Sequence, residues 1–545
     1  MKKMILVLSL VLTCTVAFAI PARRGQWKTL KLADGTEVRA ELRGDEFCRY
    51  WQAEDGRKFV IDRKTGLAGE ADMGAMKARA DQRRARVGSQ RARRSPQARL
   101  EMGESHSPYV GEKKGLIILV EFADMPFRDG HDTELFHRMA NEEGFSEGHF
   151  QGSIKDYFKA QSFGKFVVDF DVKGPVRMDK GYAYYGENME DGFENLFRMS
   201  EMVLAACRGI DGETDFSDYD WDGDGVVDLV YLLYAGYGEA DSHEEATIWP
   251  HQYALSYISQ AQEFDGVTVN AYACSSELND ADDLSGIGAV CHEFSHGLGL
   301  ADLYDVTYNY NHYGVGNWSL MCNGCYNDNG YVPAGYTSYE RWYAGWIEPT
   351  VLANDTVVAD MGSLGRTGQA YVIYNDAHPD EYYLLENRQQ EGWDEALPES
   401  GMLILHVDFD ADLWAANMVN GTEVQHCSIF LADNEADYGS GDSYPYKGNN
   451  SLTDTSLPAA TLHHPNTDGR RLMGKPVTGI TRNDDGTMAF VFRNETVPTG
   501  IDGNTADTKA SGDKRIYRLD GSYVGTDLNV LQKGVYIVGG KKIVK

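Results

Sequence analysis

The sequence predicts a multidomain protein in which an α+β domain precedes a β-rich, sandwich-like domain, with a separate N-terminal unit and a small C-terminal β module. The chain has 545 residues, too many for one ordinary hydrophobic core. Its first half contains unbroken apolar runs, and its second half contains short strands separated by Gly, Asn and Asp. The predicted units are residues 1–19, 20–105, 106–350, 351–495 and 496–545.

The first 19 residues have the order of a secretory signal peptide. Lys2 and Lys3 precede an apolar run from Met4 to Val16, and Ala17-Phe18-Ala19 offers small residues for cleavage after Ala19. The run is too short to span a bilayer, and no other stretch approaches the ~20 apolar residues of a membrane helix. We therefore expect a protein without a transmembrane segment that is secreted or lies on the cell surface.

Residues 20–105 are predicted to be a pro-segment. Residues 25–66 alternate charged and apolar positions around turn signals, which indicates hairpins. Residues 76–99 are rich in Ala, Arg and Gln and have helix propensity but little apolar face. We interpret this run as a protease-sensitive connector, with a solvated helical linker as the alternative, and place the cleavage region at Arg91-Ala-Arg-Arg94.

Charge is unevenly distributed along the chain. The net charge is −32, yet residues 20–100 contain 20 Lys and Arg against 11 Asp and Glu. A basic pro-segment in front of an acidic body favours docking of the one on the other. The acidic body argues against nucleic acid as a partner and is compatible with calcium.

Residues 106–350 combine strands and helices. The runs Gly115–Phe122 and Leu229–Ala235 suit strands that are buried on both faces. Helices are expected at Gly286–Leu300 and Tyr339–Trp346. Beyond residue 350 the strand patterns are QAYVIY, EYYLLENR, GMLILHVDF and MAFVFR, and they favour a sandwich.

The stretch CHEFSHGLGLADLYD carries the strongest chemical signal. His292 and His296 are four residues apart, so on a helix both can reach one metal ion. Glu293 lies beside them, where it can take a proton from a metal-bound water. Gly299 can end the helix and return the chain, so that Asp302 becomes the third ligand.

Asp305 competes with Asp302 for the role of third ligand. Asp302 lies ten residues after His292, which is the spacing that the long form of this motif requires, so we favour Asp302. A carboxylate oxygen binds zinc at about the distance of an imidazole nitrogen. The negative charge of the carboxylate makes the zinc a weaker Lewis acid than a third histidine would.

Met321 follows 25 residues after His296, in the turn NWSLMC, and this combination resembles a metzincin. The chain also resembles the immune inhibitor A family of secreted bacterial metallopeptidases. Four features carry this resemblance: the Asp in third place, the strand GLIILVEFADMPF, the DxDxDG run, and the pair EYYLLENRQQEGWD and GMLILHVD. The similarity extends over roughly residues 109–490.

The resemblance implies a metzincin-like catalytic domain that cleaves proteins or peptides. It implies roles for five residues: zinc ligands His292, His296 and Asp302, general base Glu293, and Met321 as a hydrophobic floor beneath the zinc. One position departs from some metzincins, because Asn323 stands where they have a tyrosine. The donor that stabilises the oxyanion is left open among Tyr304, Tyr308, Tyr310 and Tyr313.

A second metal, calcium, is predicted in the run DWDGDGVVD at residues 220–228. Carboxylates alternate and Gly225 is sixth, as in the first half of a calcium loop. The twelfth position is Tyr231, so the ion needs other ligands to complete its shell. The predicted ligands of this structural ion are Asp220, Asp222, Asp224 and Asp228; the alternative is an acidic surface turn.

Other metal-ligating and thiol groups are interpreted as structural. The β-rich region contains His406, Asp408, His426, Asp433 and Asp442, for which we favour ordinary polar roles over a further metal site. Cys322 and Cys325 have the spacing of a redox pair, but a structural bridge or packing role is favoured. A cap on the zinc by Cys48 is the less favoured alternative for inhibition by the pro-segment.

The last module, IYRLDGSYV to KGVYIVGGKKIVK, resembles the C-terminal sorting domains of the type IX secretion route; a small structural hairpin is the alternative. Together these features predict a secreted zinc endopeptidase made as a zymogen. The opposing hypothesis is a catalytically inactive, calcium-stabilised surface adhesin or binding protein on a peptidase fold.

Overall fold

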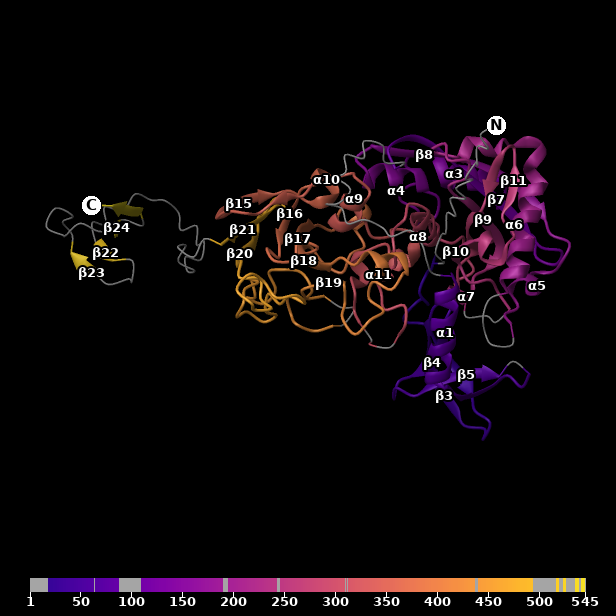
Figure 1. The fold of residues 1–545 in the computed structure, drawn as a ribbon, viewed down its shortest axis with the longest axis horizontal. Coiled ribbons are helices and arrows are strands. Elements are labelled where there is room, and N and C mark those ends of the chain that lie inside the picture. Colours follow the sequence, from indigo (N-terminus) through magenta and orange to yellow (C-terminus); the bar gives the residue numbers. More distant parts are fainter. Residues whose placement is uncertain are drawn as a thin grey trace, which may run out of the picture. The chain divides into compact units, whose positions relative to one another are not determined.

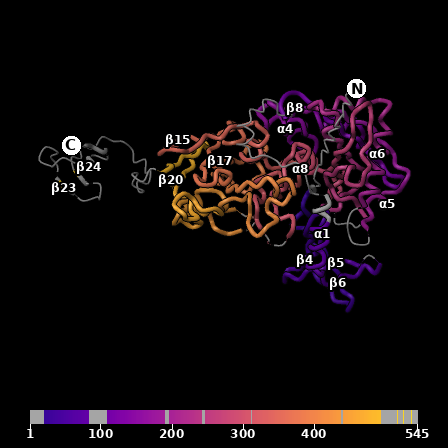
Figure 2. Tube along the Cα trace, in the orientation of Figure 1, coloured from indigo at the N-terminus to yellow at the C-terminus, as the bar shows by residue number. Residues whose placement is uncertain are grey.

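The computed structural model describes residues 18–62, 64–87, 109–189, 195–242, 246–308, 310, 312–436 and 440–493, and four strands beyond them. The chain forms two compact units, Met1–Asn494 and Glu495–Lys545. Figure 2 follows the larger unit from the indigo N-terminal part through the magenta part to the orange β-rich part. The architecture is mixed α/β with several sheets (Figure 1).

A six-stranded sheet forms the centre of the larger unit. Its central strands β8, β7, β9 and β13 run parallel to one another, whereas β10 and β1 add antiparallel strands at one edge. In spatial order the strands are β1 (Phe18–Ala19), β10 (His251–Ala254), β13 (Ala271–Leu278), β9 (Val230–Tyr237), β7 (Gly111–Glu121) and β8 (Phe166–Arg177).

Strand β7 is buried on both faces, as the sequence predicts. Ile117 and Leu119 belong to one hydrophobic cluster, and Leu116, Ile118 and Val120 belong to another on the opposite face. Successive side chains of a strand point to opposite faces, so an unbroken apolar run is needed where both faces are covered. Strand β9 is buried in both clusters in the same way.

Short helices accompany this sheet. Helix α8 contacts β10 and β13 (Figure 1) and is shorter than the helix predicted from the sequence, because the chain leaves the helical conformation before Gly299. The helices of this part are α3 (Thr133–Asn141), α4 (Ile154–Gln161), α5 (Tyr182–Gly186), α6 (Leu196–Ile210), α7 (Glu239–Ser242), α8 (Gly288–Gly297) and α9 (Ser338–Tyr343).

The N-terminal unit forms the predicted hairpins as one five-stranded antiparallel sheet, followed by helix α1 (Met73–Val87). The strands are β2 (Trp27–Lys31), β3 (Glu37–Gly44), β4 (Arg49–Ala53), β5 (Lys58–Asp62) and β6 (Leu67–Glu70). Apolar residues of this sheet join the same core cluster as those of β7. The predicted cleavage region at residues 91–94 lies outside the described residues.

The β-rich part contains a five-stranded and a three-stranded sheet around a shared core. The predicted strands are present as β16, β17, β18 and β21, while the finer arrangement as a sandwich stays a prediction. The five-stranded sheet is β14 (Thr350–Val351), β16 (Ala370–Tyr374), β17 (Glu381–Arg388), β18 (Gly401–Asp408) and β19 (Cys427–Ile429). The other is β15 (Thr356–Met361), β21 (Met488–Phe492) and β20 (Val477–Arg482).

A buried arginine connects the β-rich part to the metal-site region. The Arg388 guanidinium, at the end of β17, donates to both Asp394 oxygens at 2.8 and 2.6 Å. It also donates to the carbonyls of Trp318 and Gly335 at 2.9 and 3.0 Å. A paired and fully hydrogen-bonded guanidinium can be buried, and removing one partner is costly. These bonds therefore fix the loops on either side of Met321.

The smaller unit contains a four-stranded antiparallel sheet, in the order β23 (Tyr523–Gly525), β22 (Ile516–Arg518), β24 (Val535–Val538) and β25 (Lys541–Val544). None of the helices among the described residues is both long and apolar enough to cross a membrane. Among the described residues, seven cysteines, Cys322 and Cys325 included, are buried and form no disulfide.

Candidate metal centre

His292, His296 and Asp302 converge in one buried site. The Nε2 atoms of the two histidines lie 3.1 Å apart, and Asp302 Oδ1 lies 3.2 Å from His292 Nε2 and 3.6 Å from His296 Nε2. Two ligand atoms bonded to one zinc ion at ~2.0–2.1 Å lie about 3.3 Å apart in a tetrahedral shell. The three groups therefore fit a zinc ion without rearrangement.

Backbone carbonyls fix the tautomer of both histidines. His292 Nδ1 lies 2.7 Å from the Leu320 carbonyl oxygen, and His296 Nδ1 lies 2.8 Å from the Leu300 carbonyl oxygen. A carbonyl oxygen only accepts, so each Nδ1 carries the hydrogen. Each Nε2 then presents its lone pair to the site, which is the usual outer-shell arrangement for metal-binding imidazoles.

Two glycines allow this geometry. Gly288, at the start of α8, has the Cys325 carbonyl oxygen 1.9 Å from where a Cβ would lie, so the helix start packs directly on backbone. Gly299 has a φ of +85°, which only glycine adopts readily. The turn at Gly299 brings Asp302 back to the histidines, as its position in the motif predicts.

Asp305 is engaged elsewhere. Its Oδ1 accepts hydrogen bonds from the amide and hydroxyl of Thr307 at 3.0 and 2.7 Å, and its Oδ2 accepts from the Tyr310 amide at 2.9 Å. Asp305 thus closes a local turn, whereas Asp302 faces the imidazoles. Met321 is fully buried, and its carbonyl accepts from the Leu303 amide at 2.8 Å, so the two loops are joined beside the site.

Asn417 is a residue of the site that the sequence analysis missed. It follows helix α11 (Ala411–Ala415) in the β-rich part, and its Nδ2 donates to Asp302 Oδ2 at 2.6 Å while its Oδ1 accepts from the Asp302 amide at 2.8 Å. These two bonds orient the Asp302 carboxylate so that Oδ1 faces the histidines. The contact joins residues 115 positions apart, and no local sequence pattern could have indicated it.

Glu293 lies on α8 between the two histidines and is fully buried. Its Oε1 accepts a hydrogen bond from the Ile20 amide at 2.7 Å, and its Oε2 has no partner among the described residues. Burial, and after it the negative charge of Asp302, raise the pKa of Glu293 well above its usual value. Glu293 therefore keeps one carboxyl oxygen without a hydrogen bond from the described residues, on the helix that carries both histidines.

The start of the N-terminal unit lies on top of Glu293. Strand β1 pairs with β10, and the Ile20 carbonyl then accepts from Trp249 Nε1 at 2.9 Å. Tyr326 Oη donates to the Pro21 carbonyl at 2.7 Å. Ile20 is only 1% exposed, so this segment fills the space beside the candidate base.

Ion pairs hold the N-terminal unit on the acidic surface, as its charge predicts. Arg23 Nη1 lies 2.9 Å from Asp241 Oδ1 and 2.7 Å from Asp280 Oδ1. Arg49 Nη1 lies 2.7 Å from Glu239 Oε2. These arginine side chains are each 14% exposed, so solvent screens the pairs less than it would on an open surface.

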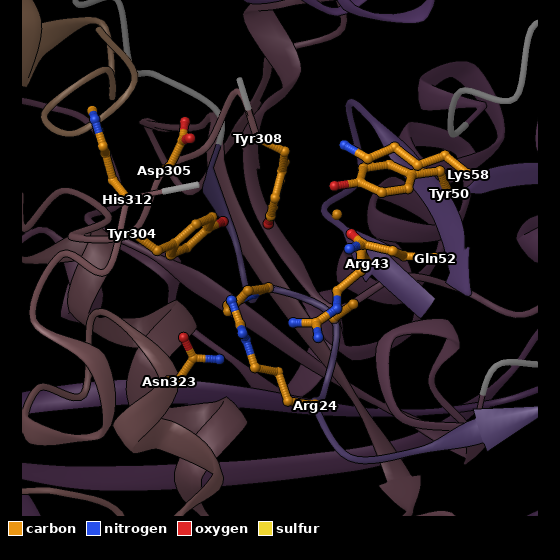
Figure 3. A pocket seen from close by; sticks show the side chains of 13 residues that line it. Arg24, Arg43, Tyr50, Gln52, Lys58, Tyr304, Asp305, Tyr308, His312 and Asn323 are labelled. Carbon is orange, nitrogen blue, oxygen red and sulfur yellow. The ribbon is translucent and has the colours of Figure 1, made fainter. Parts of the chain in front are cut away.

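A cavity of about 220 Å³ lies between this unit and the loop that follows Asp302. Figure 3 shows Arg24 and Arg43 on one side, facing the hydroxyl ends of Tyr304 and Tyr308 on the other. Asn323 also lines it. The cavity therefore adjoins the metal-site loop, and the N-terminal unit forms much of its wall.

The four tyrosines considered as oxyanion donors are placed differently. Tyr313 Oη donates to Asp442 Oδ2 at 2.7 Å, which removes it as a donor. Tyr310 is 45% exposed, whereas Tyr304 and Tyr308 line the cavity. Cys48 is buried and lies outside the ligand group that the described residues form at His292.

The predicted calcium loop brings Asp220, Asp222 and Asp224 together, with ligand atoms within 4.8 Å of one another. Asp228 is not part of that group, and its Oδ2 accepts from the Trp221 amide at 2.6 Å. Burial, and then the charges of the other three, raise the pKa of Asp228 to about 7. The concentrated negative charge is compatible with a cation.

The acidic and histidine residues of the β-rich part divide into two groups. Asp442 Oδ2 accepts from Tyr313 and Trp318, and Asp433 Oδ1 accepts from the Glu435 amide, so both have ordinary structural roles. His406, Asp408 and His426 instead lie in a larger cluster with residues that the sequence analysis did not consider: Glu381, His378, His463 and His464.

A buried His-His-Asp group with a glutamate beside it on the same helix is the arrangement of a metallopeptidase. Residues 104–347 match the family described as immune inhibitor A peptidase M6, catalytic domain. This match supports a metallopeptidase hydrolase, and with it the predicted resemblance over this region. The C-terminal sorting module stays a prediction.

Two relatives agree with the class. The chain is 25% identical to the pre-pro-metalloprotease PrtV of Vibrio cholerae serotype O1 (strain M66-2) over 287 residues, 43% of this chain and 30% of that protein. It is 26% identical to Immune inhibitor A of Bacillus thuringiensis subsp. alesti over 255 residues, 39% of this chain and 36% of that protein. The chain thus spans about a third of the length of these curated relatives.

Replacement of Asn417 by glycine is expected to weaken metal binding and any hydrolytic activity about 10- to 100-fold, as is usual when an outer-shell partner of a ligand is lost. Glycine is the suitable replacement because Asn417 has a φ of 54°. The zinc dissociation constant, measured by competition with a chromogenic chelator, checks this. Asn434→Gly, at an exposed residue with a φ of 61°, is the matched control. Equal zinc affinity in both variants would contradict the role of Asn417.

Proposed function

We propose that this protein is a zinc-dependent endopeptidase, made as a zymogen and secreted, that hydrolyses peptide bonds of extracellular proteins. The proposal rests above all on Glu293, a buried carboxyl that follows His292 on the same helix and whose Oε2 has no partner among the described residues, next in the chain to a converged His-His-Asp group. The alternative of an inactive adhesin is not favoured by the metalloprotease matches.

His292, His296 and Asp302 would hold the metal through Nε2, Nε2 and Oδ1. A zinc ion bound there would supply a Lewis acid that lowers the pKa of a water ligand to about 7. Glu293 Oε2 would accept a proton from the attacking water and pass it to the leaving amine, so that one carboxylate would serve as general base and then as general acid. Asn417 keeps Asp302 in the orientation that this geometry needs.

Inhibition by the pro-segment would operate by occupation of the site. Ile20 fills the position beside Glu293, and the arginine pairs hold the unit in place. Removal of residues 20–105 would free Glu293 and the wall of the cavity at Tyr304. The name of the Vibrio relative, a pre-pro-enzyme, agrees with such a precursor.

The proposed function also includes three further elements: the signal peptide, the type IX sorting module, and Met321 as a hydrophobic floor beneath the zinc. Cleavage after Ala19 would make Ile20 the first residue of the exported precursor. Residues 1–17 lie outside the described part of the chain, so the leader stays a prediction from the sequence, as does recognition of the last module by type IX secretion machinery.

Replacing Glu293 by alanine in the processed protein is expected to lower the rate of casein or gelatin hydrolysis by about 10²- to 10⁴-fold, the usual contribution of a general base. Zinc content, determined on the same samples, should be unchanged because the ligands remain. Glu293→Gln, which keeps the shape but not the basicity, should lose the same activity. Equal turnover by wild type and Glu293→Ala would defeat the proposal.

In the precursor, replacing Arg23 by alanine removes two ion pairs and should weaken docking by about 1–2 kcal/mol. That corresponds to a roughly 5- to 30-fold larger open fraction. The measurement is hydrolysis of a fluorogenic peptide by uncleaved precursor, whose first residue is verified by mass spectrometry as Ile20. Arg39→Ala is the control, because its partner Glu54 lies within the same unit and both are well exposed. No increase in the Arg23→Ala precursor would contradict inhibition by docking.

We also propose that Asp220, Asp222 and Asp224 bind a structural calcium ion, with Asp228 held close by. A calcium-selective chelator is then expected to lower the melting temperature by about 1 °C for each kcal/mol of binding free energy lost, because the unfolding entropy of about 2.1 cal/mol/K per residue is summed over a large unit. Differential scanning fluorimetry measures this. The Asp222→Asn/Asp224→Asn protein should not respond to the chelator, while Asp484→Asn, at an exposed residue, should respond like wild type. An unresponsive wild type would count against the ion.

A further inference from the structure

A histidine cluster lies at the ends of strands β17 and β18, in the β-rich part. It gathers five of the 14 histidines of the chain around two buried carboxylates, Glu381 and Asp408. The histidines are His378, His406, His426, His463 and His464. This concentration has no role in the proposed peptidase site, which uses other residues.

We propose that His378, Asp408 and His464 form a second metal site, for zinc or a similar first-row divalent ion. Their ligand atoms lie within 4.8 Å of one another. His464 Nε2 lies 3.3 Å from Asp408 Oδ1, close to the 3.2 Å between His292 Nε2 and Asp302 Oδ1. The pair therefore has the ligand spacing of the first site. This inference does not depend on the peptidase proposal.

His378 supplies an independent observation. Its Nδ1 is buried and has no hydrogen-bond partner among the described residues. Leaving a buried polar atom without a partner is costly, so such atoms call for an explanation. The His378 ring stacks on the His464 ring at 3.9 Å with an angle of 7° between the planes. An ion bound to an imidazole lies near the plane of the ring, so one of the two rings would turn out of the stack when both bind the ion. A bound metal ion would satisfy the unpaired nitrogen.

Glu381 positions the ligands rather than binding the ion. Its Oε1 accepts from His406 Nε2 at 2.8 Å and from the His463 amide, and its Oε2 accepts from the His464 amide and Asn375 Nδ2, both at 3.0 Å. Four donors saturate this carboxylate. The 2.8 Å separation from His406 is a hydrogen bond and is shorter than the roughly 3.3 Å between two ligands of one ion.

His463 and His426 orient Asp408. His463 Nδ1 lies 2.9 Å from Asp408 Oδ2, and His426 Nδ1 donates to the Asp408 backbone carbonyl at 2.8 Å. The hydrogen bond from His463 fixes Oδ2, which leaves Oδ1 facing His464. Carboxylates that bind metals are commonly held through their second oxygen in this way.

The donor set selects the class of ion. Two imidazoles and one carboxylate suit zinc, cobalt, nickel or copper, whereas calcium and magnesium need mainly oxygen ligands. The His464 side chain is 44% exposed, so an ion can enter from solvent and a water can complete its shell. The three ligands come from the turn before β17, the end of β18 and the loop at residues 463–464, so the ion would clamp three separate segments.

The second metal site includes Asp408, which directly precedes the segment that reaches the first site. Asp408 ends β18, and the chain then passes through α11 to Asn417, which holds Asp302. A metal ion at the second site would therefore stabilise the platform from which the β-rich part reaches the peptidase site.

Zinc stoichiometry tests the proposal. The full chain, equilibrated with zinc by dialysis and analysed by inductively coupled plasma mass spectrometry, should hold two zinc ions. His378→Ala/His464→Ala should hold one, His292→Ala/His296→Ala should hold one, and the protein with all four changes should hold none. His137→Ala, at an exposed histidine on α3, is the control and should hold two.

The outcomes for the two sites are separable. If His292→Ala/His296→Ala keeps all its zinc, the peptidase proposal fails while the second site is still tested by the His378/His464 pair. If His378→Ala/His464→Ala binds as much zinc as the His137→Ala control, the second site is overturned. Asp408→Asn keeps the shape of the side chain and removes its charge, and it should lose the ion of the second site. Added zinc should raise the melting temperature of His292→Ala/His296→Ala but not that of the protein with all four histidine changes.

Discussion

The structure depends on burying two carboxylates and two imidazoles in one place. Glu293 and Asp302 are both fully buried; Glu293 accepts a hydrogen bond from an amide of the N-terminal unit, and Asp302 contacts the two imidazoles and the Asn417 side chain. Desolvating carboxylates is costly unless a cation or several hydrogen bonds compensate. A bound metal ion would compensate this cost, and several loops meet around the site.

Three parts of the chain supply the contacts around this site. The six-stranded sheet carries α8, the N-terminal unit supplies the segment at Ile20, and the β-rich part supplies Asn417 and Arg388. One hydrophobic cluster runs through all three parts, so the site is not the property of one domain. The β-rich part in particular fixes the metal-site loops through two polar contacts, Asn417 on Asp302 and Arg388 on the carbonyls of Trp318 and Gly335.

Charge complementarity has a related role where the N-terminal unit lies over Glu293. Arg23 and Arg49 reach acids of the body, while the backbone at Ile20 and Pro21 is bound by Glu293 and by Trp249 and Tyr326. Most of these bonds involve backbone of the covering segment, so its position depends little on its own side chains. The arginines then contribute to how tightly it is held, and their ion-pair partners are Asp241, Asp280 and Glu239 rather than the metal ligands.

The sequence by itself determined what depends on neighbours along the chain. The spacing of His292, Glu293 and His296 placed three groups on one helix, Gly299 gave the turn to Asp302, and the apolar run of β7 gave a strand covered on both faces, because helical and strand periodicities are local. Tertiary structure decided what depends on distant partners: the hydrogen bonds from Asn417 to Asp302, the position of Ile20 at Glu293, and the meeting of His378, Asp408 and His464. No periodicity encodes these, since they arise where separate strands and loops are packed against one another.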